Sequence, residues 1–150
     1  MRIRKNASWF ICTIAKESAH NWDICKSVSS WGIPTSGRKL SMDQAKKGDY
    51  LLIYLASKGF IGIASITGPM KRPADRAEAP WAGGIYRYGI VIPFELEMEM
   101  EEPLKKLFVE MKIAGTSITA TALRRGFTRI SNADGETLAT EMAKFPVKQK

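Results

Sequence analysis

Two cysteines and one histidine are the side chains of this sequence whose types could support metal binding or nucleophilic catalysis. Cys12 and Cys25 lie far apart, and each has apolar neighbours, a pattern typical of small buried thiols. Together with His20 they fall short of the four ligands of a usual zinc site. A catalytic cysteine–histidine pair is conceivable, but buried thiols beside a surface imidazole are the commoner arrangement. We therefore expect no catalytic residue, no metal and no cofactor.

Two tryptophans in predicted loops suggest a different chemistry, the stacking of a flat ligand on an aromatic ring. Trp31 lies within the segment 29–37, whose Gly and Pro residues exclude a regular element. Trp81 lies near the end of the long polar segment 70–84. Long loops in small domains are more often functional or disordered than inert, and a tryptophan within one favours the functional case. Both rings are therefore candidates for a binding role.

Charge is unevenly distributed along the chain, whose net charge is +8. Residues 1–47 carry a net charge of +6, residues 48–102 carry −3, and residues 103–150 carry +5. If the fold brings the two basic ends together, they form a positive face suited to phosphate groups. Ordinary solubilising charge explains the same numbers equally well.

The first half of the chain shows clear strand and helix patterns. The bulky run Trp9–Ile14 predicts a buried central strand. Ser18 is the expected cap of a short helix. Two apolar runs, 50–56 and 60–67, are separated by a Ser-Lys-Gly turn and predict a β-hairpin.

The second half predicts further strands and three helical stretches. Strand character runs over 85–92 and continues with strict alternation to Met100. Pro103 precedes apolar residues at helical spacing, which predicts a helix that starts there. That helix buries Leu104, Leu107, Phe108 and Met111. The other predictions are a helix over 117–125, a strand over 127–130, and a last helix capped by Asn132 that carries Leu138 and Met142.

These elements predict one α+β domain with a curved, mostly antiparallel sheet flanked by short helices. We expect a basic N-terminal segment over 1–8, the domain over 9–145 and a basic tail over 146–150. Apolar runs are too short for a membrane helix, and the N-terminus makes a poor signal sequence. A cytoplasmic protein without membrane contact is expected.

Four motifs, taken in order, resemble the EVE family of the PUA-like superfamily, which is related to YTH domains. Any one of them alone is common, but their order and spacing match. The motifs are Trp9-Phe10-Ile11-Cys12-Thr13, Asn21-Trp22, Trp31-Gly32-Ile33-Pro34, and Lys47-Gly48-Asp49-Tyr50-Leu51-Leu52-Ile53-Tyr54. The resemblance covers most of the chain from Trp9 to Met142.

The resemblance implies a PUA-like, barrel-like sheet with a pocket that holds a modified nucleobase flipped out of its strand. Trp31 is then one aromatic wall, and Asn21 hydrogen-bonds the base edge. We propose Trp81, in the long segment 70–84 that matches no family motif, as the second wall. Thr13, Ile14 and Gly32 complete the predicted pocket. Candidates for phosphate contacts are Arg124, Arg125, Arg129, Arg38 and Lys39. Arginines near a helix C-terminus also stabilise the helix without any ligand.

Physical chemistry supports such a pocket independently of the family. Stacking on an aromatic ring stabilises a bound base by about 1 to 3 kcal/mol. A methyl group adds only about 1 kcal/mol by transfer from water, so discrimination requires a pocket closely shaped around it.

The partner implied is DNA or RNA with a modified, methylated base, together with a possible restriction or nuclease partner domain. One alternative is an unselective RNA-binding module of translation or RNA modification machinery. Another is an amidohydrolase similar to the ASCH group, acting on acylated cytidine through a lysine, a threonine and a glutamate. Thr13, Lys16 and Glu17 are available, although their spacing matches no recognisable ASCH motif. We therefore expect a non-enzymatic reader.

Overall fold

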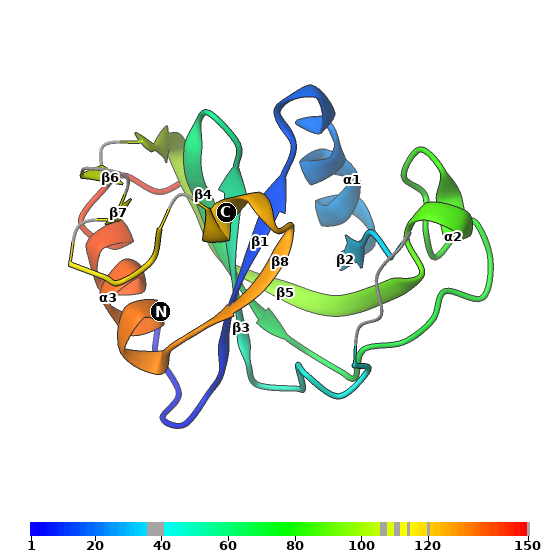
Figure 1. The fold of residues 1–150 in the computed structure, drawn as a ribbon, viewed down its shortest axis with the longest axis horizontal. Coiled ribbons are helices and arrows are strands. Elements are labelled where there is room, and N and C mark those ends of the chain that lie inside the picture. The colour runs from blue at the N-terminus through cyan, green and yellow to red at the C-terminus, as the bar shows by residue number, and fades with distance from the viewer. Residues whose placement is uncertain (36–40, 106–107, 110–111, 114, 120, 150) are drawn as a thin grey trace.

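The computed structural model describes residues 1–35, 41–105, 108–109, 112–113, 115–119 and 121–149. Within them, six strands form one curled sheet (Figure 1). These are β1 (Trp9–Ile14), β2 (Ser30–Ile33), β3 (Tyr50–Leu55), β4 (Gly59–Ile66), β5 (Ile90–Leu104) and β8 (Phe127–Ile130). They lie in the order β2-β5-β4-β3-β1-β8, and only the β1–β3 pair is parallel. The predicted α+β fold with a curved, mostly antiparallel sheet is confirmed.

The centre of the sheet is buried on both faces, as the bulky sequences of β1 and β3 require. Alternate residues of β1 enter different apolar clusters, with Phe10 on one face and Trp9 on the other. Phe10 stacks on Phe127 of β8 with ring centroids 4.9 Å apart, and Trp9 stacks on Tyr50 of β3 at 4.5 Å. Two cores, one on each side of the sheet, therefore hold β1 in place.

The predicted hairpin is confirmed as β3 and β4, and the predicted strand over 127–130 is confirmed as β8. Gly59 has a φ of +131°, so a residue without a Cβ suits the turn. Ser57, at φ +67°, is the other turn residue in the left-handed region.

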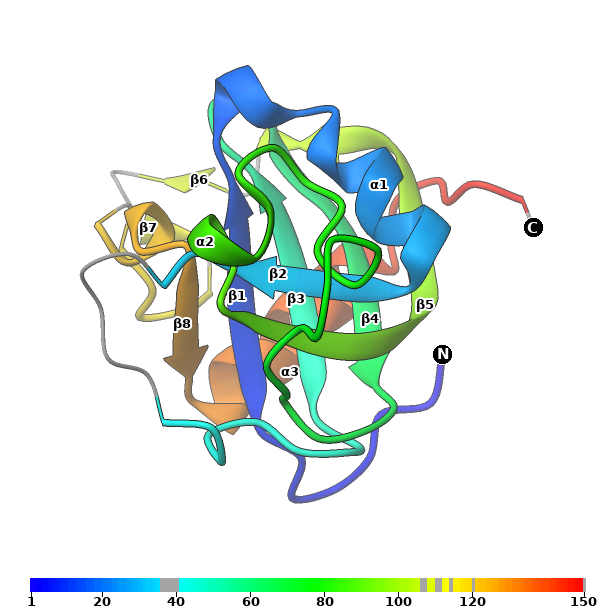
Figure 2. The same cartoon turned by 90° about the vertical axis from the view of Figure 1, so that its right-hand side faces the viewer.

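Strand β5 is one strand of 15 residues that curves around the molecule (Figure 2). Its first residues pair with β2, and its later residues pair with β4 through two shifts of register. Beyond these pairs, the backbone N–H of Lys148 donates to the carbonyl of Glu99 at 2.7 Å, so the chain end adds to the outer edge of β5. The division into a basic segment, a domain and a tail stays a prediction.

Helix α1 (Asn21–Val28) follows a 3-10 turn, η1 (Lys16–Ser18), and helix α3 (Asn132–Met142) follows β8. The predicted cap Ser18 is wrong, because the 3-10 turn uses Ser18 and α1 begins after His20. Helix α3 is capped by Ser131, one residue before the predicted Asn132; its Oγ accepts the N–H of Asp134 at 3.1 Å. Leu138 and Met142 on this helix are buried as predicted.

The prediction that segment 29–37 lacks regular structure is wrong for Ser30–Ile33, which form β2. Each of these residues pairs with β5, Trp31 opposite Ile92 and Gly32 opposite Val91. The Gly and Pro signals describe local preference, whereas β2 is stabilised by a strand about 60 positions later in the chain.

The predicted helix after Pro103 is also wrong. Strand β5 continues to Leu104, which pairs with Phe60, and the chain then forms a hairpin of β6 (Phe108–Val109) and β7 (Lys112–Ile113). A helix that starts at Pro103 would break the pairing of Leu104 with Phe60. The hydrogen bonds between β4 and β5 therefore favour a strand here, although the apolar residues have helical spacing. Leu107 and Met111 of that prediction lie outside the described residues.

Two further predictions are corrected. The helix predicted over 117–125 is reduced to the 3-10 turn η3 (Ala122–Arg124), because the preceding Thr and Ser residues favour side-chain bonds to the backbone over helix. The strand predicted from Ile85 begins at Ile90, since 84–87 form helix α2 (Gly84–Arg87) after Gly83 at φ +97°. Within the described residues, no helix is long and apolar enough to cross a membrane.

Candidate functional site

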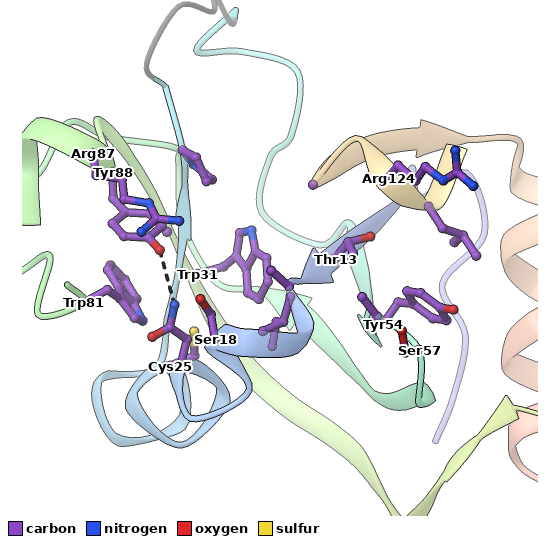
Figure 3. A pocket seen from close by; sticks show the side chains of 18 residues that line it. Thr13, Ser18, Cys25, Trp31, Tyr54, Ser57, Trp81, Arg87, Tyr88 and Arg124 are labelled. Carbon is purple, nitrogen blue, oxygen red and sulfur yellow. Dashed lines mark hydrogen bonds between the residues drawn. The ribbon is translucent and has the colours of Figure 1, made fainter. Parts of the chain in front are cut away.

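A pocket of about 600 Å³ opens where the ends of β1 and β3 face α1, β2 and α2 (Figure 3). That volume lies within the range of small-molecule sites in proteins. The lining includes all six residues predicted for a base pocket, together with Arg124. The lining residues are Thr13, Ile14, Ala15, Ser18, Asn21, Cys25, Trp31, Gly32, Pro34, Tyr54, Ala56, Ser57, Trp81, Arg87, Tyr88, Leu123, Arg124 and Gly126.

Trp31 reaches the pocket because β2 is a strand. Ser30 and Gly32 share the other face of the strand, on which Trp81 and Tyr88 pack against Gly32. Figure 3 shows the Trp31 indole between Thr13 on one side and Trp81 with Tyr88 on the other. The indole is only 4% exposed, yet its Nε1 has no hydrogen-bond partner. Trp31 is therefore a residue of the apolar core that also borders the cavity, and its N–H has no acceptor among the described residues.

Gly32 allows the second tryptophan to lie against β2. A Cβ at this position would meet the Trp81 ring at 2.7 Å and the Tyr88 ring at 3.0 Å. Trp81 and Tyr88 in turn pack with ring centroids 5.2 Å apart at an angle of 51°. The long connection predicted over 70–84 therefore returns to the sheet and places Trp81 beside Tyr88 at the pocket.

The side chain of Asn21, the first residue of α1, is hydrogen-bonded to one member of this aromatic pair. Its Nδ2 donates to the Tyr88 hydroxyl at 3.2 Å, while its Oδ1 has no partner. Thr13 Oγ1, at the end of β1, is likewise unpaired. The amide orientation leaves a hydrogen-bond acceptor available beside the cavity.

Unpaired polar atoms concentrate in this pocket. Among the described residues, four buried side-chain polar atoms lack a partner, and all four belong to lining residues: Thr13 Oγ1, Asn21 Oδ1, Trp31 Nε1 and Trp81 Nε1. Leaving a buried polar group unpaired costs about 1 to 3 kcal/mol. Such a cluster in one open pocket suits a site where a ligand or ordered water completes the hydrogen bonds.

The thiol that lines the pocket is unsuited to nucleophilic chemistry. Burial raises the pKa of Cys25 to about 12, although the nearby Trp81 indole N–H and the Gly32 backbone favour the thiolate in part. The Trp81 N–H lies near this weak acceptor without the geometry of a hydrogen bond. Burial also raises the pKa of Cys12, and His20 is exposed at the start of α1. Both cysteines therefore remain thiols at neutral pH.

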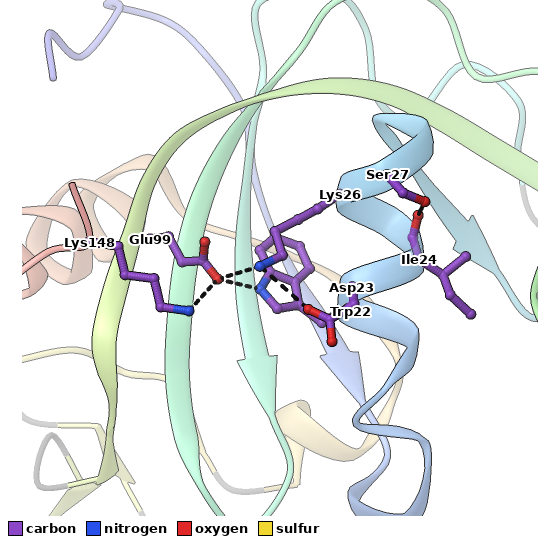
Figure 4. Close-up of polar contacts among 7 residues, drawn as sticks. All are labelled: Trp22, Asp23, Ile24, Lys26, Ser27, Glu99 and Lys148. Atoms are coloured by element: carbon purple, nitrogen blue, oxygen red, sulfur yellow. Dashed lines mark hydrogen bonds and ion pairs between the residues drawn. The ribbon is translucent and has the colours of Figure 1, made fainter. Parts of the chain in front are cut away.

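Helix α1 is held in place from its other side. Asn21 and Cys25 line the pocket, whereas Trp22 and Lys26 both donate to Glu99 Oε2 of β5 at 2.9 Å (Figure 4). Lys148 approaches the same oxygen at 3.2 Å. Burial raises the pKa of Glu99, but the hydrogen bonds from Lys26, Trp22 and Lys148 outweigh this effect. The pKa of Glu99 is therefore lowered. An ionised Glu99 thus fixes the helix that positions Asn21.

The predicted phosphate contacts lie in different places. Arg124, at the end of η3, lines the pocket, whereas Arg125 and Arg129 line a separate hollow of about 320 Å³. Arg129 also donates to Ser8 Oγ at 3.0 Å. Arg38 and Lys39 lie outside the described residues.

Arg87, Tyr88, Tyr54 and Ser57 also line the pocket and were missed by the sequence analysis. The guanidinium of Arg87 lies over the Tyr88 ring, 5.3 Å from its centroid. Gly89, inside the predicted strand over 85–92, was a signal for a break, because β5 begins directly after it at Ile90 and the residues before it, Arg87 and Tyr88, line the pocket.

The possible catalytic set does not assemble in the pocket. Thr13 lines the cavity, whereas Lys16 and Glu17 are exposed on η1 and are not part of the lining. Across the described residues, no group of three or more His, Cys, Asp or Glu side chains could hold a metal ion.

No protein-family model matches the sequence, and no curated protein matches it either. Solved structures do match. The YTH domain of Zygosaccharomyces rouxii MRB1 protein, in complex with N6-methyladenosine RNA, aligns with a TM-score of 0.67 and 16% identity over 98% of this chain and 94% of that one. The YTH domain of Toxoplasma CPSF4 with a 7-mer m6A-modified RNA gives 0.69 and 18% over 95% of each chain. A hypothetical protein from Leishmania major gives 0.67 and 12%, over 93% of this chain and 97% of that one. The chain therefore has the PUA-like fold of YTH domains.

Proposed function

We propose that this protein is a non-enzymatic reader that binds a modified nucleobase, flipped out of its strand, in the pocket beside Trp31 and Trp81. The observation that supports this most directly is the gathering of four unpaired buried polar atoms around one open cavity with two indoles in its wall. Flat aromatic surfaces favour a heterocycle, and unpaired donors and acceptors favour a ligand with a polar edge. A nucleobase has both properties.

The chemistry of the pocket suits a base whose edge both donates and accepts hydrogen bonds. The indole N–H groups of Trp31 and Trp81 can only donate, whereas Asn21 Oδ1 can only accept. Thr13 Oγ1 can do either. A methylated amino group of a base keeps one N–H for an acceptor and adds a methyl group for the apolar wall. N6-methyladenine fits this description, and two of the matching solved structures contain it in RNA.

The polymer is bound through arginines at the pocket. Arg124 and Arg87 come from opposite sides of the lining, from η3 and α2 respectively (Figure 3). Their charges suit the phosphates on either side of a base that enters the cavity. The net charge of +8 supports binding to a polyanion in general.

Within the PUA-like fold, we assign the chain to the EVE branch. The support is the ordered set of sequence motifs, whose residues Thr13, Asn21, Trp31 and Gly32 all line the pocket. This assignment keeps DNA with 5-methylcytosine as an alternative ligand to RNA with N6-methyladenine. A modified-base restriction system, with a nuclease as partner, is the corresponding setting.

The test is a binding panel at one fixed salt concentration. Matched single-stranded RNA and DNA oligonucleotides carry one N6-methyladenine, one 5-methylcytosine or the unmodified base. We expect the protein to bind one modified oligonucleotide more tightly than its unmodified partner. Equal affinity for every modified and unmodified pair contradicts the proposal and indicates an unselective nucleic-acid-binding module instead.

A further inference from the structure

An exposed tyrosine stands next to the pocket. Tyr86 is 90% exposed, by far the largest value among the large hydrophobic side chains of the described residues, and Ile85 beside it is 38% exposed. Single exposed apolar residues are ordinary on protein surfaces. Three features of helix α2 set this one apart: its attachment, its neighbours and its charge.

The first feature is that α2 is attached to the pocket at both ends. The N–H of Gly84 donates to the carbonyl of Trp81 at 2.9 Å, and the N–H of Thr35 donates to the carbonyl of Arg87 at 3.0 Å. Figure 2 shows α2 beside the end of β2, the strand that carries Trp31. These bonds fix the backbone of α2, and with it the backbone of Tyr86, relative to Trp81 and to the residues that follow β2.

The second feature is the sequence neighbourhood of the ring. Tyr86 directly precedes Arg87 and Tyr88, both of which line the pocket. Consecutive Cα atoms are about 3.8 Å apart, so the backbone of Tyr86 lies next to the backbone of a residue that lines the pocket. Arg87 extends back over Tyr88, which leaves the Tyr86 ring uncovered on the outside.

The third feature is the charge around α2. Residues 71–88 carry four basic and two acidic side chains. One of the carboxylates, Glu78, is paired with Lys71 at 2.6 Å. Arg76 lies near Gly84, so two guanidinium groups, those of Arg76 and Arg87, flank the helix. An exposed aromatic ring among arginines is the combination that binds single-stranded nucleic acid through stacking and phosphate contacts.

We propose that Tyr86 is a second base-binding position, on which the nucleotide adjacent to the flipped base stacks while Arg87 contacts the phosphate that joins the two. This rests on the proposed function and deepens it, because the ligand becomes a single-stranded step of two nucleotides rather than one base. The pocket selects the modification, and Tyr86 adds affinity with little preference for sequence, since every base has a flat face.

The experiment compares two ligands, N6-methyladenosine 5′-monophosphate and a single-stranded RNA trinucleotide with N6-methyladenosine at its centre. Tyr86→Ala is expected to weaken trinucleotide binding by about 5- to 150-fold and to leave mononucleotide binding unchanged. Tyr86→Phe keeps the ring and is expected to bind as the native protein does. Ile85→Ala, a matched change at the neighbouring exposed residue, is expected to have no effect.

Ligand changes complete a double-mutant cycle. An abasic nucleotide replaces the residue on the 5′ side or the 3′ side of N6-methyladenosine. On one side, the loss of the base is expected to weaken binding to the native protein but not to Tyr86→Ala. A 2-aminopurine at the same position is expected to be quenched by the native protein alone.

The outcomes test the base pocket and the stacking position at Tyr86 separately. If the native protein binds both ligands and Tyr86→Ala binds the trinucleotide equally well, the stacking position is wrong and the base pocket stands. Equal losses for both ligands identify Tyr86 as a structural residue, which also overturns the inference. If the native protein binds neither ligand, the assignment of N6-methyladenine fails, and the Tyr86 inference fails with it.

Discussion

Gly32 and Trp81 lie so close that a Cβ on the glycine would stand 2.7 Å from the indole ring. The two residues are far apart in the sequence, and their contact brings the long connection between β4 and β5 to the pocket. Because Tyr88 lies 3.0 Å from the same position, any side chain at residue 32 displaces one ring or both.

Gly32→Ala is therefore expected to destabilise the protein by about 1 to 3 kcal/mol, the usual cost of an added methyl group in a packed core. The same change is expected to weaken binding of the modified oligonucleotide, because Trp81 moves. Denaturant unfolding and a binding titration measure the two effects. Gly68→Ala is the matched control, since its Cβ would meet one Pro93 carbon at 3.3 Å outside the pocket. A Gly32→Ala protein with native stability and affinity would contradict this close packing.

Trp31→Ala is expected to abolish discrimination between modified and unmodified oligonucleotides and to weaken binding of the modified one by about 5- to 150-fold, the worth of one stacked base. Trp31→Phe retains a ring but lacks the unpaired Nε1 donor. We expect it to keep part of the affinity, and the remaining loss combines the hydrogen bond with the smaller stacking surface of the phenyl ring. Competition titrations give both numbers. Unchanged selectivity in Trp31→Ala would place the base elsewhere.

Charge reversal separates the arginines that line the pocket from the others. Arg124→Glu is expected to weaken binding of modified and unmodified strands equally and to reduce the salt dependence, by about 0.7 in the log–log slope per lost phosphate contact on a single strand. Arg129→Glu is the comparison, because Arg129 lines the separate hollow and bonds Ser8. The measurement is affinity against salt concentration. Equal effects of the two variants would indicate a general electrostatic attraction, in which the nucleic acid makes no specific contact with Arg124.

Glu99 is expected to make stability depend on acid pH. Its folded-state pKa lies below the unfolded value of about 4.3, so its contribution is present above that pH and is lost as pH falls through the folded-state pKa. Glu99→Gln is expected to lower stability at pH 7 by about 1 to 3 kcal/mol, since the bonds from Trp22 and Lys26 lose their charged acceptor. Glu101→Gln, an exposed change on the same strand, is the control. Parallel pH profiles for native protein and Glu99→Gln would contradict this role.

Cys25 is expected to resist thiol reagents at neutral pH. Its folded-state pKa of about 12 lies above the unfolded value of about 8.5, so the stability linked to it is complete below pH 8.5 and declines as pH rises toward 12. Reaction with a disulfide reagent is expected to require unfolding, and Cys25→Ala is expected to flatten the alkaline decline. Rapid labelling of Cys25 in the folded protein would show that the pocket exposes this thiol.

The sequence by itself determined the central elements. Continuous apolar runs predicted β1 and the β3–β4 hairpin, because a strand buried on both faces needs apolar residues at every position. The ordered motifs contain Thr13, Asn21, Trp31 and Gly32, which the fold brings to one cavity, and Trp81 was predicted only from its place in a long loop. Their role as a base-binding site stays a prediction.

Tertiary structure decided the remainder. Strand β2, the continuation of β5 through Pro103 and the path of the chain through α2 all depend on pairing with distant segments, whose stabilisation exceeds local preference. Tyr88, Arg87 and the exposed position of Tyr86 followed from that path. Local spacing reports which face of an element is apolar, but contacts between residues far apart in the chain decide which partner covers that face and which side chains remain uncovered.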